Sequence, residues 1–134
     1  MDLVEILLVE DNPGDVTLTR RALGQCPMDI RLFVARDGEE ALRMLADPEF
    51  RPSLIILDLN MPRVSGFGVL ERHGGGSAPL VIFSSSWNEA DVQMALMLGA
   101  REYVRKPIAL KAFTDAILGI VDRWLVPTCE PIAC

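Results

Sequence analysis

Hydrophobic residues in this chain gather in short runs, and polar segments separate the runs. Most of the runs are continuously apolar, which is typical of strands covered on both faces of a sheet. One run alternates apolar and polar residues, as expected of a half-covered strand at an edge; it covers residues 30–34. The pattern predicts five strands, at residues 6–9, 30–34, 54–57, 80–83 and 101–105.

Between these strands, apolar residues recur at helical spacing. A helix start is indicated by Asn12 as the cap, Pro13 at the first helical position and Asp15 as an acid in the first turn. We expect helices at residues 13 to about 25, 38 to about 47, 65–72, 89–98 and 110–126. Five strands that alternate with five helices predict an α/β fold with a parallel sheet and right-handed crossovers.

The length of 134 residues fits one domain. We expect a domain at residues 1–126 and a short tail at 127–134, with no output domain. The longest apolar runs have only four or five residues, which excludes a membrane-spanning helix. The first residues lack the basic region of a secretory signal, so a cytoplasmic location is expected.

The net charge of −6 and the pI near 4.7 argue against a nucleic-acid partner. Affinity for nucleic acids comes mainly from basic side chains that neutralise phosphates. Cys26, Cys129 and Cys134 lack metal-site spacing, and the only histidine, His73, is far from them in sequence. We interpret the cysteines as free thiols in a reducing compartment.

Polar side chains follow four of the expected strands, where each strand ends. Glu10 and Asp11 follow the first strand, Asp58 the third, Ser84 the fourth and Lys106 the fifth. In open α/β sheets the carboxyl ends of parallel strands meet at one crevice, where ligands bind. Each residue alone is more often a turn or surface residue. Their joint position at strand ends favours a functional site.

The residue types of this group suit phosphoryl chemistry. Three carboxylates form a hard-oxygen cluster suited to Mg²⁺, and without a cation they would raise one another's pKa. A carboxylate can attack a phosphoryl group to form an acyl phosphate, while a metal ion and Lys106 neutralise charge on the phosphoryl oxygens. Ser84 can donate a hydrogen bond to another of these oxygens. Asp58 is the candidate nucleophile, since its strand lies in the middle of the sheet.

The chain resembles the receiver domain of two-component response regulators over about residues 3–125. Four motifs carry the resemblance, namely Glu10-Asp11, Asp58 with Met61-Pro62, Ser84-Ser85 and Lys106-Pro107. The resemblance implies a flavodoxin-like sheet of strand order 2-1-3-4-5.

By this resemblance, Asp58 accepts a phosphoryl group from a histidine kinase. Glu10 and Asp11 would hold Mg²⁺, and the backbone carbonyl of Asn60 would complete the metal site. Ser84 and Tyr103 would form a switch that alters the surface of the fourth helix, fifth strand and fifth helix.

A narrower resemblance points to the small regulators paired with bacterial phytochrome kinases. It rests on the segment 10–15, the serines 84–86 and the segment 122–125. It implies a phytochrome-type histidine kinase as partner. Two positions depart from the family pattern: Glu10 stands where an aspartate is common, and Ser84 where a threonine is common.

Three other functions remain open. A Mg²⁺-dependent phosphatase of the dehalogenase type also uses an aspartate, a metal ion and a lysine, but it needs a second acid where Asn60 stands. A phosphorylation-independent binding module would keep the fold and signal by contact alone. A flavin-binding protein would need a phosphate-cradling loop after the first strand, where Glu10 and Asp11 would repel a phosphate.

The fourth helix has more apolar residues than one packed face requires. Val92, Ala95 and Leu96 form one apolar face, and Met94, Met97 and Leu98 form another. One face packs on the sheet, so the other could meet a partner. Together with the apolar segment 124–126 at the end of the last helix, this surface could produce a homodimer. Ordinary wrapping around the core is the alternative interpretation.

Overall fold

The computed structural model of the chain describes residues 3–60, 66–73, 76–86 and 88–125. Five strands form a sheet of order β2-β1-β3-β4-β5, and every pair of neighbours is parallel. The predicted α/β class and strand order are therefore confirmed. The elements are β1 (Leu3–Val9), α1 (Pro13–Leu23), β2 (Asp29–Ala35), α2 (Gly38–Ala46), β3 (Leu54–Leu57), α3 (Gly66–His73), β4 (Leu80–Ser84), α4 (Glu89–Met97), β5 (Glu102–Arg105) and α5 (Leu110–Leu125).

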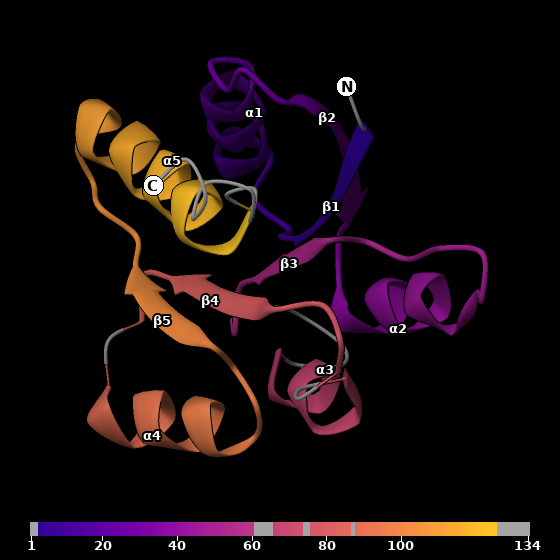
Figure 1. The fold of residues 1–134 in the computed structure, drawn as a ribbon. Helices are drawn as coiled ribbons and strands as arrows, with labels where there is room; N and C mark the ends of the chain where they lie inside the picture. The colour runs from indigo at the N-terminus through magenta and orange to yellow at the C-terminus, as the bar shows by residue number, and fades with distance from the viewer. Residues whose placement is uncertain (1–2, 61–65, 74–75, 87, 126–134) are drawn as a thin grey trace, which may run out of the picture.

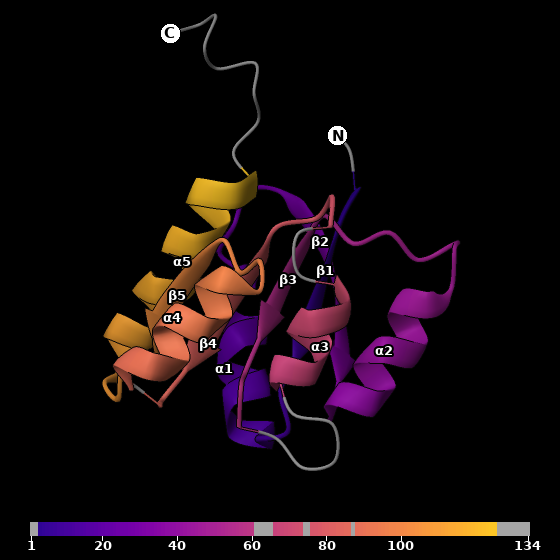
Figure 2. The ribbon, with the colours of Figure 1, turned by 90° about the horizontal axis from the view of Figure 1, so that it is seen from below.

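The helices cover both faces of the sheet. Helices α1 and α5 lie on one face, and α2, α3 and α4 lie on the other (Figure 1 and Figure 2). Successive residues of a strand point to opposite faces. Leu7 and Leu57 therefore join the core under α2, α3 and α4, whereas Ile6 and Ile56 join the core under α1 and α5. This double burial explains why the central strands are continuously apolar.

Side-chain caps, of which Asn12 was predicted above, fix where three helices begin. Asn12 Oδ1 accepts hydrogen bonds of 2.8 and 3.1 Å from the amides of Gly14 and Asp15. Asp37 caps α2, and Asn88 caps α4 through a 2.8 Å bond to the Ala90 amide. These bonds satisfy amides that a helix start leaves without intrahelical partners. The start of α1, which lies beside the candidate site, is thus held in place.

Several boundaries and faces differ from the sequence predictions. Helix α1 ends at Leu23, and the amides of Gln25 and Cys26 beyond it bond three residues back, to the carbonyls of Ala22 and Leu23 at 3.0 and 3.1 Å, which tightens the last turn. Leu96, grouped with Val92 and Ala95 on one predicted face, is 45% exposed, and Leu110, the first apolar residue at helical spacing in the last helix, is 60% exposed. Leu110 starts α5, and burial in this helix begins one turn later. Leu98, grouped in the sequence with Met94 and Met97, packs against the core as the residue that ends the helix, whereas the two methionines are exposed.

The motif residues Met61 and Pro62, the predicted helix residue Ser65 and the expected tail lie outside the described residues. The helix expected at 65–72 is observed as α3, Gly66–His73. Across the described parts of the chain, every helix is too short or too polar to span a lipid bilayer.

Candidate functional site

The register of the sheet brings the ends of its strands level. Val9 pairs with Leu57, so Glu10 and Asp58 leave neighbouring strands at the same height. The Asp58 amide donates a 3.0 Å hydrogen bond to the Val9 carbonyl, which extends this pairing by one residue. On the other side of β3, the Lys106 amide donates to the Ser84 carbonyl at 2.9 Å. The predicted meeting of these side chains at one edge is therefore observed.

The ammonium group of Lys106 lies at the centre of the site. Its Nζ is 2.6 Å from Oε1 of Glu10, 2.8 Å from Oδ2 of Asp15 and 3.2 Å from Oδ2 of Asp58. An ammonium group has three N–H donors, so each donor can meet one carboxylate. The Lys106 side chain is only 8% exposed, and Glu10 and Asp58 are buried. Three acids thus share one cation in a poorly hydrated place.

Burial and the neighbouring charges shift the pKa values of two of these groups. Burial raises the pKa of Glu10 to about 7; the hydrogen bond and charge of Lys106 oppose the rise, and the charge of Asp58 adds to it. Burial by itself would lower the pKa of Lys106, but its bonds to Asp15 and Glu10 and the charge of Asp58 hold that pKa above its ordinary value. Lys106 is therefore a permanent cation, and the acids still carry uncompensated charge.

Three of the acids have the geometry to hold a metal ion. Glu10, Asp11 and Asp58 each offer a carboxylate oxygen, and these oxygens lie within 4.8 Å of one another. Asp11 is exposed, so the cluster opens to solvent on its side. The Asn60 amide donates a 3.1 Å hydrogen bond to Oδ1 of Asp58, and the Asn12 amide donates at 3.2 Å to Oε2 of Glu10. Clustered carboxylates with access to water fit Mg²⁺, which keeps several waters when it binds.

Two hydroxyl groups lie in one hydrogen-bonded group beside the acids. Ser84 is fully buried at the end of β4, and its Oγ accepts a 3.2 Å bond from the Ser86 amide. The Tyr103 hydroxyl donates a 2.7 Å bond to the Ser86 carbonyl. Burial raises the pKa of Tyr103, against the effect of hydrogen bonds with Ser84 and Ser86. The two predicted switch residues are therefore linked through one loop.

Two residues of this region were not predicted as site residues. Asp15 was assigned only to the helix start, although the first turn of α1 begins at the same edge as the acids. Gly66 was placed in a helix without further comment. A Cβ atom at Gly66 would lie 2.6 Å from Cα of Leu59 and 2.7 Å from the carbonyl oxygen of Asp58. Only glycine lets α3 begin this close to Asp58.

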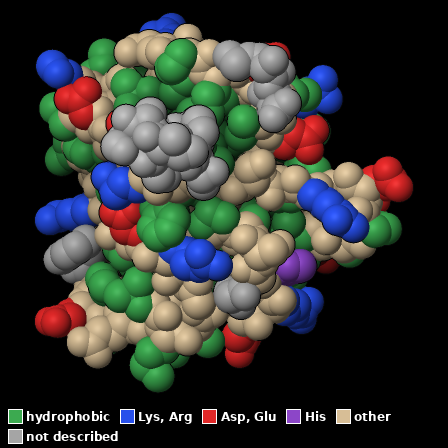
Figure 3. Space-filling model, viewed as in Figure 1, with side chains coloured by type: hydrophobic (Ala, Val, Ile, Leu, Met, Phe, Trp, Pro, Cys, Tyr) green, Lys and Arg blue, Asp and Glu red, His purple; other side chains and the backbone are tan. Residues whose placement is uncertain are grey.

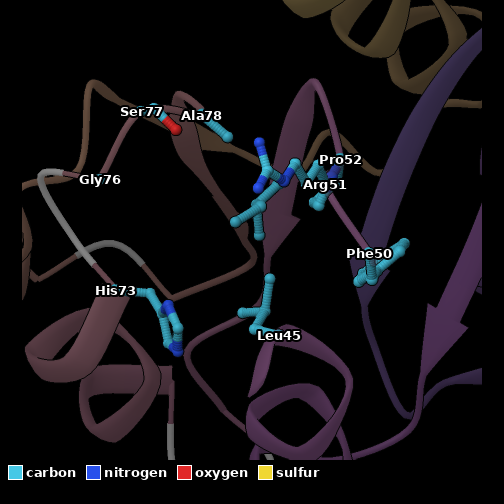
Figure 4. Close-up of a pocket in the computed structure, with 9 residues that line it drawn as sticks. Leu45, Phe50, Arg51, Pro52, His73, Gly76, Ser77 and Ala78 are labelled. Atoms are coloured by element: carbon cyan, nitrogen blue, oxygen red, sulfur yellow. The ribbon is translucent and has the colours of Figure 1, made fainter. Parts of the chain in front are cut away.

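A separate hollow of about 230 Å³ lies at the opposite edge of the sheet, between the ends of α2 and α3 (Figure 4). Its lining includes Leu45, Arg51 and His73, and the lining residues that the structure describes include no carboxylate. The same edge faces the viewer in Figure 3, where His73 is the purple side chain and basic and acidic groups are interspersed. The hollow therefore does not share the chemistry of the acidic cluster.

Known proteins share both the sequence pattern and the fold. Residues 6–118 match the family model of the response regulator receiver domain. The response regulator Rcp1 of Synechocystis sp. is 34% identical over 96% of this chain and 93% of its own length. Other curated relatives are longer proteins, of which the chain spans between 24% and 51%.

Solved structures give the same result. The Mn²⁺-bound form of Rcp1 has a TM-score of 0.85 at 34% identity, over 93% of this chain and 96% of that one. The phosphorylated cyanobacterial phytochrome response regulator RcpA has a TM-score of 0.88 at 32% identity, with the same coverage. The bacteriophytochrome response regulator AtBRR has a TM-score of 0.68 at 37% identity, over 90% and 95%. The chain therefore belongs to the response regulator receiver domain family, the signalling modules of two-component systems.

Proposed function

We propose that this receiver domain accepts a phosphoryl group on Asp58 in a Mg²⁺-dependent reaction and transmits the signal through protein contacts. The observation that carries the proposal is the position of Asp58. It lies at the end of the central strand β3, with the Lys106 ammonium 3.2 Å away and two further acids within reach of a shared metal ion. The domain would occupy residues 1–126, followed by a tail at 127–134; the family match and α5 both fall within the first range.

Glu10, Asp11 and Asp58 would hold Mg²⁺, with the backbone carbonyl of Asn60 as a further ligand. The metal ion supplies positive charge that offsets the carboxylates and the oxygens of the incoming phosphoryl group. Support comes from the carboxylate cluster and from the charge that Lys106 leaves uncompensated. The relative Rcp1 has been solved in a Mn²⁺-bound form.

The reaction is a nucleophilic displacement at phosphorus. A carboxylate oxygen of Asp58 forms a new bond to phosphorus while the bond from phosphorus to the donor atom breaks, and the donor leaves with that electron pair. With a phosphohistidine donor, the imidazole leaves and takes up a proton. Lys106 and the Ser84 hydroxyl would contact the oxygens on which negative charge gathers.

Ser84 and Tyr103 would relay the change to the surface. A phosphoryl oxygen that attracts the Ser84 hydroxyl would disturb the loop to which Tyr103 is bonded through Ser86. Tyr103 could then move into the space that Ser84 leaves. A local charge event of this kind can bias an element with two alternative arrangements, here α4, β5 and α5.

The proposed donor is a histidine kinase, and the relatives favour one of the phytochrome type. RcpA and AtBRR are described as phytochrome and bacteriophytochrome response regulators, respectively.

We place the protein in the cytoplasm, where its cysteines can remain reduced. Met94, Leu96 and Met97 are 51%, 45% and 85% exposed on α4, so this helix is the surface where a homodimer would form.

The test is intact-mass analysis after incubation with acetyl phosphate, with and without Mg²⁺. We expect one phosphoryl addition to the wild-type protein only when Mg²⁺ is present, and none to Asp58→Asn. Asp115→Asn is the matched control, because Asp115 is an exposed aspartate on α5 that pairs only with the exposed Lys111 among the described contacts.

Different results would contradict the proposal in different ways. A phosphoryl group retained by Asp58→Asn would place the acceptor elsewhere. No addition to the wild-type protein from acetyl phosphate or from a phosphorylated histidine kinase would favour a phosphorylation-independent binding module. Continuous turnover of a generic phosphate ester would favour a phosphatase.

A further inference from the structure

Asp15 is the one carboxylate beside Lys106 to which the proposed function gives no role. Its Oδ2 lies 2.8 Å from the Lys106 Nζ, which is shorter than the 3.2 Å contact of Lys106 with Asp58. Asp15 does not belong to the cluster of acids that can share a metal ion. It is also not the proposed acceptor. The contact therefore needs an explanation of its own.

The other two partners of Lys106 change during the proposed reaction. Mg²⁺ would draw the carboxylate of Glu10 toward itself, and Asp58 would become an acyl phosphate. Two of the three acceptors of the ammonium group are then engaged elsewhere, whereas the reaction leaves Asp15 unchanged. Asp15 is thus the partner that can hold Lys106 before, during and after phosphoryl transfer.

A lysine needs such a partner because its side chain is long and flexible. Ordering a lysine side chain in one conformation costs conformational entropy. Lys106 follows the last residue of β5, so the strand fixes its backbone but not its ammonium group. Asp15 lies on a rigid support, because Asn12 caps α1 and accepts a 3.1 Å bond from the Asp15 amide.

We propose that Asp15 is a positioning residue that holds the Lys106 ammonium where it meets the phosphoryl oxygens. The inference rests on the proposed function, since it assigns the residue that orients a group of that same site. Asp15 acts through Lys106 alone and touches neither the metal ion nor the phosphoryl group.

The first test measures the position of Lys106 without any phosphoryl transfer. The chain has two lysines, Lys106 and Lys111, and Lys111 is 88% exposed, so it is an internal reference. The protein is labelled briefly with an amine-acetylating reagent in saturating Mg²⁺, and the ratio of acetylation at the two lysines is read by mass spectrometry. We expect Asp15→Ala to raise this ratio severalfold, because Glu10 and Asp58 would then be engaged by the metal ion and the ammonium group would be released toward solvent. Asp122→Ala, which changes an exposed aspartate of α5 that contacts neither lysine among the described contacts, should leave the ratio as in the wild type.

The second test measures the initial rate of phosphorylation by acetyl phosphate at saturating Mg²⁺. We expect Asp15→Ala to slow the rate roughly ten-fold, the usual worth of one charge-assisted hydrogen bond. Asp15→Asn should slow the rate less, because the asparagine side chain keeps an oxygen that can accept a hydrogen bond from Lys106. In a Lys106→Gln background, Asp15→Ala should have no further effect, since residues that act as one unit are not additive.

These outcomes separate the inference from the function on which it rests. Unchanged labelling of Lys106 together with a wild-type or faster rate in Asp15→Ala would overturn the positioning role. If Asp15→Ala slowed phosphorylation equally in the Lys106→Gln background, Asp15 would act through the fold and not through the lysine. If Asp15→Ala does not fold, Asp15→Asn decides the same points. Failure of the wild-type protein to gain a phosphoryl group would reject the proposed function, while the labelling result would still stand.

Discussion

The ammonium nitrogen of Lys106 lies 3.2 Å from Oδ2 of Asp58, although 48 residues separate the two in the chain. The distance follows from the sheet, because β3 and β5 flank β4 and all three strands run in the same direction. In the resting protein, Lys106 offsets part of the charge of the buried acids. In the proposed reaction, the same group would offset charge on the phosphoryl group.

Lys106→Met should therefore destabilise the metal-free protein. Removal of one partner of a buried ion pair leaves uncompensated charge and costs about 3 kcal/mol in typical cases. Urea unfolding at neutral pH measures the free energy of unfolding. Saturating Mg²⁺ should restore part of the loss, because the metal ion replaces some of the missing positive charge.

Lys111→Met is the control for this prediction. Lys111 forms a 3.0 Å pair with Asp115 on α5, but both side chains are exposed. Such pairs contribute about 0 to 1 kcal/mol, so stability should hardly change. Equal stabilities of the two variants would show that the acids do not depend on Lys106.

Mg²⁺ should stabilise the folded protein, and its removal with a chelator should reverse the effect. A ligand that binds only the folded state stabilises it by about 2.7 kcal/mol at a concentration one hundred times its dissociation constant. Thermal unfolding with Mg²⁺ and with chelator measures the difference. Asp11→Asn should abolish most of the shift without damage to the fold, because Asp11 is exposed. A shift of wild-type size in Asp11→Asn would place the metal ion elsewhere.

Local patterns predicted most of the fold. The apolar runs of β1, β3 and β4 and the cap Asn12 depend on neighbours in sequence, so they could be recognised directly. The meeting of Glu10, Asp58 and Lys106 also followed, because parallel strands end at one edge.

What could not be predicted depends on distances across the fold. In the sequence, Asp15 looks like any other acid in the first turn of a helix. Only the folded structure brings Lys106 close enough to pair with it. Gly66 is essential because α3 begins against the backbone of Leu59 and Asp58, a contact that no spacing reveals. The exposure of Leu96 likewise depends on how α4 is rotated against the sheet, which helical periodicity alone left open.

Gly66→Ala should destabilise the protein by about 2 kcal/mol or more, the usual range for overpacking against a fixed neighbour. The added methyl group would lie 2.6 Å from a backbone atom, so either α3 or the end of β3 must shift. Denaturant unfolding measures the loss. Because the Asp58 carbonyl is one of the atoms contacted, Mg²⁺ affinity should also fall.

Gly24→Ala is the matched control. Gly24 has the backbone conformation of an α-helix, and a Cβ atom there would meet its nearest neighbour at an ordinary 3.4 Å. Alanine at such a position is tolerated and often stabilises slightly. If both alanine variants were as stable as the wild type, the close approach at Gly66 would not be a constraint.

Tyr103 should titrate above the ordinary pKa of a tyrosine. Burial is the main cause of its raised pKa, the charges of Asp91 and Asp58 add to it, and hydrogen bonds with Ser84 and Ser86 act against it. It is the only tyrosine in the chain, so ultraviolet absorbance reports its ionisation directly. The midpoint should lie above 10.0 in the folded protein and near 10 in denaturant.

The raised pKa of Tyr103 determines in which direction the free energy of unfolding changes with pH. Above pH 10 the unfolded chain releases the Tyr103 proton while the folded chain still holds it, so the free energy of unfolding falls as pH rises through this range. Tyr103→Phe cannot ionise, so its stability should fall less steeply over the same range and its absorbance should not change. A folded midpoint at or below 10 would mean that the Tyr103 hydroxyl is open to water, because burial is the main cause that raises its pKa, and the buried position from which the proposed switch starts would then be wrong.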